Sequence, residues 1–126
     1  MIRYRVRMRF TDSSVIINCR DLTAGRSHIV EIGPMPSSIF FSSLLYEGLR
    51  LMEGVELKPP ADPIRKDLGH VICAVALFKD HGLIKCTAPA TGESRSLEVY
   101  PCEFAEFLGK ALESRPNTKV EYEYFK

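Results

Sequence analysis

The first ten residues alternate between apolar and polar side chains. From Ile2 to Phe10 the even positions are aromatic or aliphatic, and the odd positions from Arg3 to Arg9 are all arginine. Because successive side chains of a strand point to opposite faces, this pattern predicts a strand with one core face and one arginine-lined face. Short stretches rich in β-branched residues at 15–20 and 28–32 predict two further strands, joined by a turn at residues 23–25.

The periodicity then becomes helical, from about Ser38 to Met52. Pro34 and Pro36 precede this segment, and Ser37 or Ser38 is a suitable N-cap. One apolar stripe at helical spacing consists of Phe41, Leu44, Leu45, Gly48, Leu49 and Met52. Gly48 on this stripe would allow another backbone to approach closely. Gly54 stands where a helix C-terminus favours positive φ, and a short strand at 55–57 follows.

The second half of the chain repeats this order of elements. Strands are predicted at 71–78, 83–87, 94–100 and 120–125, with a helix at about 101–114. Residues 10–16 align with 78–84 at an offset of 68, later segments align at an offset of 67, and 55–57 fall on 120–122. A turn glycine, a Glu-containing strand and a proline before the helix recur in the same order. We therefore predict an internal duplication.

These elements predict an α+β protein with two tandem βββαβ-like repeats and two helices. The repeats cover about 1–58 and 70–126, joined by a proline-rich connector at 59–69 within a single domain. We expect one largely antiparallel sheet of six to eight strands with both helices on one face. Each half would be marginally stable alone, so the halves should pack together or against a second copy.

The first strands of the two halves differ most. At an offset of 68, the four arginines occupy the places of Val71, Cys73, Val75 and Leu77. The second of these strands is apolar on both faces, which is typical of a strand covered on both sides. Two interpretations of the arginine row remain open. It pairs with Glu121 and Glu123 of the last strand or is simply solvated, or it forms a cationic strip for phosphates or an acidic protein surface.

The first predicted helix is more apolar than the second. Phe40 and Leu51 flank its core stripe and widen the apolar arc. One interpretation is a helix buried between the two halves. The other is an exposed patch, formed by Phe40 and Leu51 with Ile39 and Tyr46, that contacts a partner or a second copy.

Composition narrows the classes of function. The 126 residues carry 17 Lys and Arg against 16 Asp and Glu, a net charge of +1, which argues against a general polyanion binder. No apolar run is long enough for a membrane span, and residues 1–7 show no signal-peptide pattern. The four cysteines have no paired spacing, which favours a cytoplasmic protein with reduced, buried thiols, although two disulfides remain possible.

The sequence contains no recognised catalytic or cofactor motif. Asp80 and His81 lie in a predicted hairpin turn and could act as an acid–base pair only within a pocket. Glu31 and Glu98 recur at matched positions, where a carboxylate near a helix N-terminus is the simpler interpretation than a catalytic pair. A zinc site is conceivable but disfavoured; its ligands would be Cys19, His28, His81 and Cys86.

We therefore expect a small cytoplasmic binding or regulatory module without enzymatic activity, metal or cofactor. It would engage a protein partner, or self-associate as a homodimer, and would not bind a membrane. The predicted binding residues are Arg3, Arg5, Arg7, Arg9, Phe40 and Leu51. One alternative is a nucleic-acid-binding module that uses the same arginine face. A second alternative is a small enzyme whose site follows no recognised motif.

Overall fold

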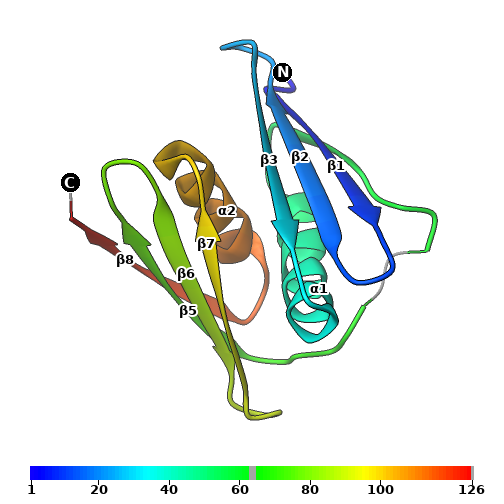
Figure 1. Cartoon of the computed structure of the whole chain (residues 1–126), viewed down its shortest axis with the longest axis vertical. Coiled ribbons are helices and arrows are strands. Elements are labelled where there is room, and N and C mark those ends of the chain that lie inside the picture. Colours follow the sequence, from blue (N-terminus) through cyan, green and yellow to red (C-terminus); the bar gives the residue numbers. More distant parts are fainter. Residues whose placement is uncertain (63–64, 126) are drawn as a thin grey trace.

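The computed structural model describes residues 1–62 and 65–125 and contains ten elements in two matching series (Figure 1). The first series comprises β1 (Tyr4–Phe10), β2 (Val15–Asp21), β3 (Arg26–Ile32), α1 (Met35–Leu51) and β4 (Val55–Lys58). The second series comprises β5 (Val71–Leu77), β6 (Gly82–Ala88), β7 (Glu93–Val99), α2 (Cys102–Ser114) and β8 (Thr118–Tyr124). The α+β class and the two βββαβ units are therefore confirmed.

The strands form two four-stranded sheets, and the prediction of one continuous sheet is wrong. The first sheet has the order β3-β2-β1-β4 and the second has the order β7-β6-β5-β8. In each unit the first three strands are antiparallel, and the last strand returns after the helix to pair in parallel with the first. Each unit thus completes its own sheet, because β4 and β8 pair within their own repeats.

The two helices lie between the two sheets (Figure 1). Helix α1 packs on the first sheet, α2 packs on the second, and the helices pack on each other. Gly48 permits this contact, since a Cβ atom built there would lie 1.8 Å from the carbonyl oxygen of Ala111. The close approach predicted for Gly48 is confirmed, and the neighbouring backbone belongs to α2. Each sheet therefore has one face against the helices and one face toward solvent.

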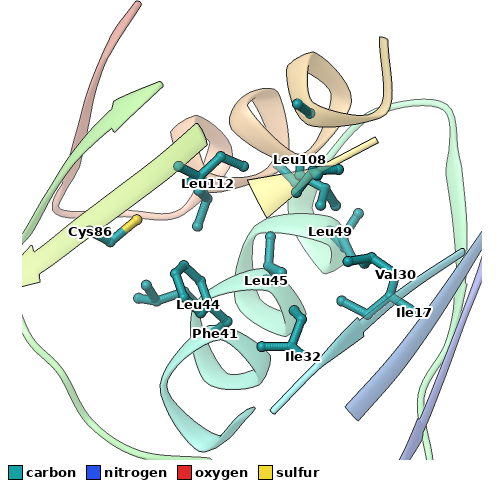
Figure 2. Close-up of a cluster of buried hydrophobic side chains, with 14 of the residues drawn as sticks. Ile17, Val30, Ile32, Phe41, Leu44, Leu45, Leu49, Cys86, Leu108 and Leu112 are labelled. Atoms are coloured by element: carbon teal, nitrogen blue, oxygen red, sulfur yellow. The ribbon is translucent and has the colours of Figure 1, made fainter. Parts of the chain in front are cut away.

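The core fills the space between the helices and the inner sheet faces. Figure 2 shows the aliphatic residues of α1 meeting those of α2, with residues of β2 and β3 nearby. Helix α1 is buried on nearly all sides, which confirms the interpretation of a helix enclosed between the halves. Fully buried members of this core include Ile17, Phe40, Phe41, Leu44, Leu45, Leu49, Leu108 and Leu112.

The structural equivalence of the repeats corrects the sequence alignment. Phe10 pairs with Val15 and Leu77 pairs with Gly82, so a single offset of 67 relates the first three strands. The turns after the first strands are equivalent at this offset. In the first repeat the Thr11 N–H donates to the Ser14 carbonyl, and in the second the Phe78 N–H donates to the His81 carbonyl. The last strands are offset by 63, since Val55 beside Tyr4 matches Thr118 beside Val71.

Because the offset is 67 and not 68, the arginines match residues on the opposite face of β5 from the one that the sequence alignment gave. Arg5, Arg7 and Arg9 correspond to Ile72, Ala74 and Ala76, and not to the buried residues Cys73, Val75 and Leu77. Strand β5 is also not covered on both faces. Ile72 is 43% exposed and Ala74 is exposed, because these side chains point away from α2.

The start of helix α1 differs from expectation, whereas the turn that follows the helix agrees with it. Helix α1 begins after Pro34 without a side-chain cap, so neither Ser37 nor Ser38 is its N-cap. The positive φ predicted for Gly54 is confirmed at 80°. Two described residues of the connector contact α1: Arg65 donates to the Tyr46 hydroxyl, and Lys66 N donates to Ser43 Oγ. The predicted connector also includes Pro63 and residue 64, which lie outside the described residues.

The cysteines also differ from the prediction of four reduced thiols. Cys73 and Cys86 are cross-strand partners on the inner face of the second sheet and form a disulfide. The equivalent partners in the first sheet are Val6 and Cys19. Cys19 therefore remains a buried free thiol, as does Cys102. The register explains this difference between the repeats, because valine occupies the place of the second cysteine.

Candidate binding face

The arginine row lies on the solvent-facing side of the first sheet. Arg5, Arg7 and Arg9 alternate with the inward-facing Val6 and Met8 along β1. Two further cations lie on the same face: Arg20 of β2 is the cross-strand partner of Arg5, and Lys58 of β4 is the partner of Arg7. We call this surface the basic face and define it by Arg5, Arg7, Arg9, Arg20 and Lys58.

Few carboxylates oppose these charges. Arg5 Nε lies 3.1 Å from Glu56 Oε2, and Arg20 donates to the hydroxyl of Ser27 at 3.4 Å. Arg7 and Arg9 make no side-chain hydrogen bond or ion pair with any residue in the ranges 1–62 and 65–125. The row is therefore only partly neutralised within the chain.

The predicted pairing of the arginines with Glu121 and Glu123 is wrong. Both glutamates belong to β8, which lies beside β5 in the second sheet. Strand β4 occupies the place next to β1, and its Glu56 is the residue that meets Arg5. Sequence alternation alone could not distinguish β4 from β8 as the neighbour of β1.

Like charges are neighbours on the basic face. Arg5 and Arg20 are directly opposite across β1 and β2, and Arg7 is opposite Lys58 across β1 and β4. Like charges in these positions destabilise a sheet by a few tenths of a kcal/mol up to about 1 kcal/mol per pair. An anionic partner would relieve this repulsion, because it places negative charge between the cations.

Two shallow depressions run along this face. One, of about 270 Å³, is lined by Arg5, Arg7, Asn18, Arg20 and Ser27. The second, also of about 270 Å³, shares Arg7 and Asn18 with the first and adds Arg9 and two apolar side chains, Ile16 and Ile29. Ile29 is 62% exposed. Sequence reasoning missed the contributions of β2 and β3, although the alternation Ile16, Asn18, Arg20 could have indicated them.

Arg3 does not belong to this row. It precedes β1, where its N–H donates to the carbonyl of Gly54. Its side chain lines a different depression, of about 420 Å³, together with Glu53, Glu103 and Glu106. Arg3 thus shares a depression with several acidic residues, unlike Arg7 and Arg9.

The apolar helix patch is not formed as predicted. Phe40 is fully buried and Tyr46 is nearly so, and a partner cannot reach Phe40 while the fold is intact. Leu51 is 49% exposed at the C-terminal end of α1. The helical wheel placed Phe40 at the margin of the stripe, but α1 is enclosed by the first sheet, α2 and the connector. Of the four residues predicted for the patch, Leu51 alone is exposed, since Ile39 is half-buried.

The other chemical candidates are separated or occupied by structural contacts. His81 donates to Asp80 at 2.7 Å, a hydrogen bond that lowers the pKa of the Asp80 carboxyl, and its ring stacks between Phe78 and Tyr100. Glu31 accepts a hydrogen bond from Ser14 on the outer face of the first sheet, whereas Glu98 lies on the outer face of the second. The two glutamates are not brought together as a catalytic pair.

Metal ligation finds no support in the described part of the chain. No group of three His, Cys, Asp or Glu residues is arranged to hold a metal ion in residues 1–62 and 65–125. The conceivable zinc ligands are divided between the sheets, with Cys19 and His28 in the first and the disulfide-bonded Cys86 in the second. Neither α1 nor α2 has the length and apolar composition of a helix that crosses a membrane.

Comparison with known proteins gives no further guide to this face. The chain matches no protein-family model, no curated protein sequence and no solved structure.

Proposed function

We propose that the protein is a non-enzymatic binding module that engages an acidic protein surface through the basic face of the first sheet. The observation that carries this proposal is that Arg7 and Arg9 have no side-chain partner among the residues that the structure describes, and that they lie next to the like-charged neighbours Arg5 and Arg20. Guanidinium groups form bidentate contacts with carboxylates, and a set fixed on a strand requires little reordering when it binds.

The composition of the face favours a protein over a nucleic acid. Ile16 and Ile29 lie beside the arginines, which matches protein interfaces, where apolar contacts combine with arginine. The tyrosine and phenylalanine of β1, Tyr4 and Phe10, lie on the opposite face, where they pack against the core. The face therefore offers no aromatic platform on which bases could stack.

A binding experiment with defined probes tests this proposal. A fluorescently labelled twelve-residue peptide of Asp, Glu and Leu and a labelled fifteen-nucleotide oligothymidylate are titrated with the protein over a range of salt concentrations. We expect the wild type to bind the peptide. In the double variant Arg7→Ala/Arg9→Ala the dissociation constant for the peptide should rise about tenfold, which corresponds to a loss of roughly 1.4 kcal/mol of binding free energy. The matched control Arg50→Ala/Lys110→Ala removes the same charge from the helices and should change little.

Two results would contradict the proposal. Equal peptide affinity for the wild type and for Arg7→Ala/Arg9→Ala would show that the basic face does not bind acidic chains. Tighter binding of the oligothymidylate than of the peptide, with a steep linear dependence of log K on log salt, would favour the nucleic-acid alternative.

A further inference from the structure

The outer face of the second sheet has a different chemistry from the basic face. Ile72, Ala74 and Ala76 of β5 point to solvent, and Leu83 of β6 is the cross-strand partner of Ala76. Ile72 and Leu83 are 43% and 41% exposed. A depression of about 320 Å³ lies over Ala74 and Ala76, because their short side chains do not fill the space between β6 and β8.

One row across this sheet carries opposite charges on its two sides. Lys85 of β6 and Glu121 of β8 are both cross-strand neighbours of Ala74. Adjacent strands are about 4.8 Å apart, so the two charged residues stand roughly 10 Å apart with alanine between them. Glu121 has only a strand neighbour as partner, Lys119 at 3.5 Å, and both of these side chains are 69% exposed. Lys85 has no ion-pair partner within the described ranges.

We propose that this face is a self-association surface that binds the same face of a second copy of the chain. Two copies can stack these outer faces about a two-fold axis that runs parallel to β5 between the sheets. The β6 side of the row in one copy then lies over the β8 side of the same row in the other copy. Lys85 of one copy then lies over Glu121 of the second copy, Glu121 lies over Lys85, and Ala74 lies over Ala74. An axis perpendicular to the strands would instead place like charges over each other. Charge complementarity therefore selects the parallel axis.

Of the two neighbouring rows, the row of Ile72 supports this arrangement. Ile72 lies over Ile72 of the second copy, which buries its exposed side chain. Leu83 lies over Glu123 of the second copy and beside Glu98 of β7, so this row adds no charge complementarity to the contact. Sheets packed face to face rotate by about 30°, so the rows nearest the axis make the closest contacts.

The same operation fails on the first sheet. Stacking two basic faces about an axis parallel to β1 would place Arg5 over Arg5, Arg7 over Arg7 and Arg9 over Arg9. Like charges brought together at an interface oppose association. Self-association through the second sheet therefore leaves the basic face open, and the inference does not depend on what the basic face binds.

The size of the face indicates a weak dimer. The four strands have seven residues each. About the axis along β5, strands β6, β5 and β8 of the two copies overlap and β7 extends beyond them, so with about 4.8 Å between strands and about 3.4 Å per residue the contact measures roughly 14 by 24 Å on each copy. The two copies together bury less than about 1,000 Å², which is below the standard range for specific interfaces and typical of weak, transient ones, so we expect a dissociation constant no tighter than micromolar.

Sedimentation equilibrium of charge-exchange variants tests the arrangement. Lys85→Glu places two carboxylates over each other at both symmetry-related contacts of the dimer, and Glu121→Lys places two ammonium groups over each other there. Each single variant should therefore raise the dimer dissociation constant about tenfold or more. The double variant, and an equimolar mixture of the two single variants, can restore opposite charges at the contacts and should recover dimerisation. Arg50→Glu, the matched control on α1, should dimerise as the wild type does.

Three results would overturn the inference. The first is a wild type that stays monomeric up to about 1 mM, where a micromolar dimer would be fully formed. The second is unchanged dimerisation of both single variants. The third is a mixture of the single variants that dimerises no better than either alone, because the proposed pairing of positions 85 and 121 places opposite charges at both contacts of the mixed dimer.

Discussion

Strands β1 and β5 occupy the same position in the two repeats, yet their two faces have diverged unequally. Toward the helices, Val6 and Met8 of β1 correspond to Cys73 and Val75 of β5, and all four are buried. Toward solvent, the arginines of β1 correspond to isoleucine and alanines in β5. A close-packed core restricts the inner face, whereas the outer face can change without loss of the fold. We therefore expect the two repeats to differ in function through their outer faces.

The largest expected effect concerns the contact that joins the repeats. Gly48→Ala places a Cβ atom 1.8 Å from the Ala111 carbonyl oxygen, so the helices must separate. We expect the free energy of unfolding to fall by at least about 3 kcal/mol, measured by urea denaturation. Gly109→Ala is the control in α2, since its Cβ would meet the Tyr122 and Val75 side chains at 3.1–3.3 Å. Equal effects of the two variants would contradict the account of the helix contact.

The disulfide provides the next comparison, because only the second repeat has one. Cys73→Val recreates the valine–cysteine pair of Val6 and Cys19. The crosslink spans a sequence separation of 13 residues, and its loss should cost about 2–3 kcal/mol under oxidising conditions. Under reducing conditions the wild type and the variant should differ by less than about 1 kcal/mol. A difference that is the same in both conditions would show that the two sulfur atoms are not bonded.

The free thiol of the first repeat predicts a dependence on alkaline pH. Burial, and secondarily Asp21, raises the pKa of the Cys19 thiol from 9.0 to about 12. Because the folded-state pKa lies above the unfolded value, the stabilisation is complete below pH 9 and is lost as the pH rises toward 12. Between about pH 9 and about pH 10.5 the wild type should lose roughly 1.5 kcal/mol more than Cys19→Ala. Parallel pH profiles of the two proteins, measured by urea denaturation, would contradict this prediction.

Much of the fold could be predicted from local patterns. Alternation in β1 and helical spacing in α1 indicated the element types, and the recurring turn glycines indicated the duplication. The positive φ angles of Gly25 and Gly92, 71° and 74°, fit the predicted turns. These features depend on short-range geometry, so local residue patterns specify them directly.

The register between the repeats was harder to predict. Matching Phe10 to Phe78 set the offset one residue too high, because Phe78 lies after β5 and stacks on His81 and Phe125 instead of continuing the strand. Strand β5 is apolar on both faces and shows no alternation that could have corrected the error. A shift of one residue exchanges the faces, which is why the sequence alignment matched the arginines to core residues.

The candidate site was predictable only in part. The row Arg5, Arg7 and Arg9 was found because one strand carries all three. The contributions of Arg20 and Lys58 depend on which strands lie beside β1, and that depends on non-local pairing. The burial of Phe40 depends likewise on the packing of α1 between the first sheet and α2, which its own periodicity does not reveal.

The most direct measurement transfers the outer residues of β5 onto β1 in the triple variant Arg5→Ile/Arg7→Ala/Arg9→Ala. Its free energy of unfolding should stay within about 1 kcal/mol of the wild type, since only the exposed Arg5–Glu56 pair and some like-charge repulsion are lost. Its binding of the acidic peptide should fall below detection. Unfolding of the variant would show that the arginines serve the fold, and retained peptide binding would show that the basic face is not the binding surface.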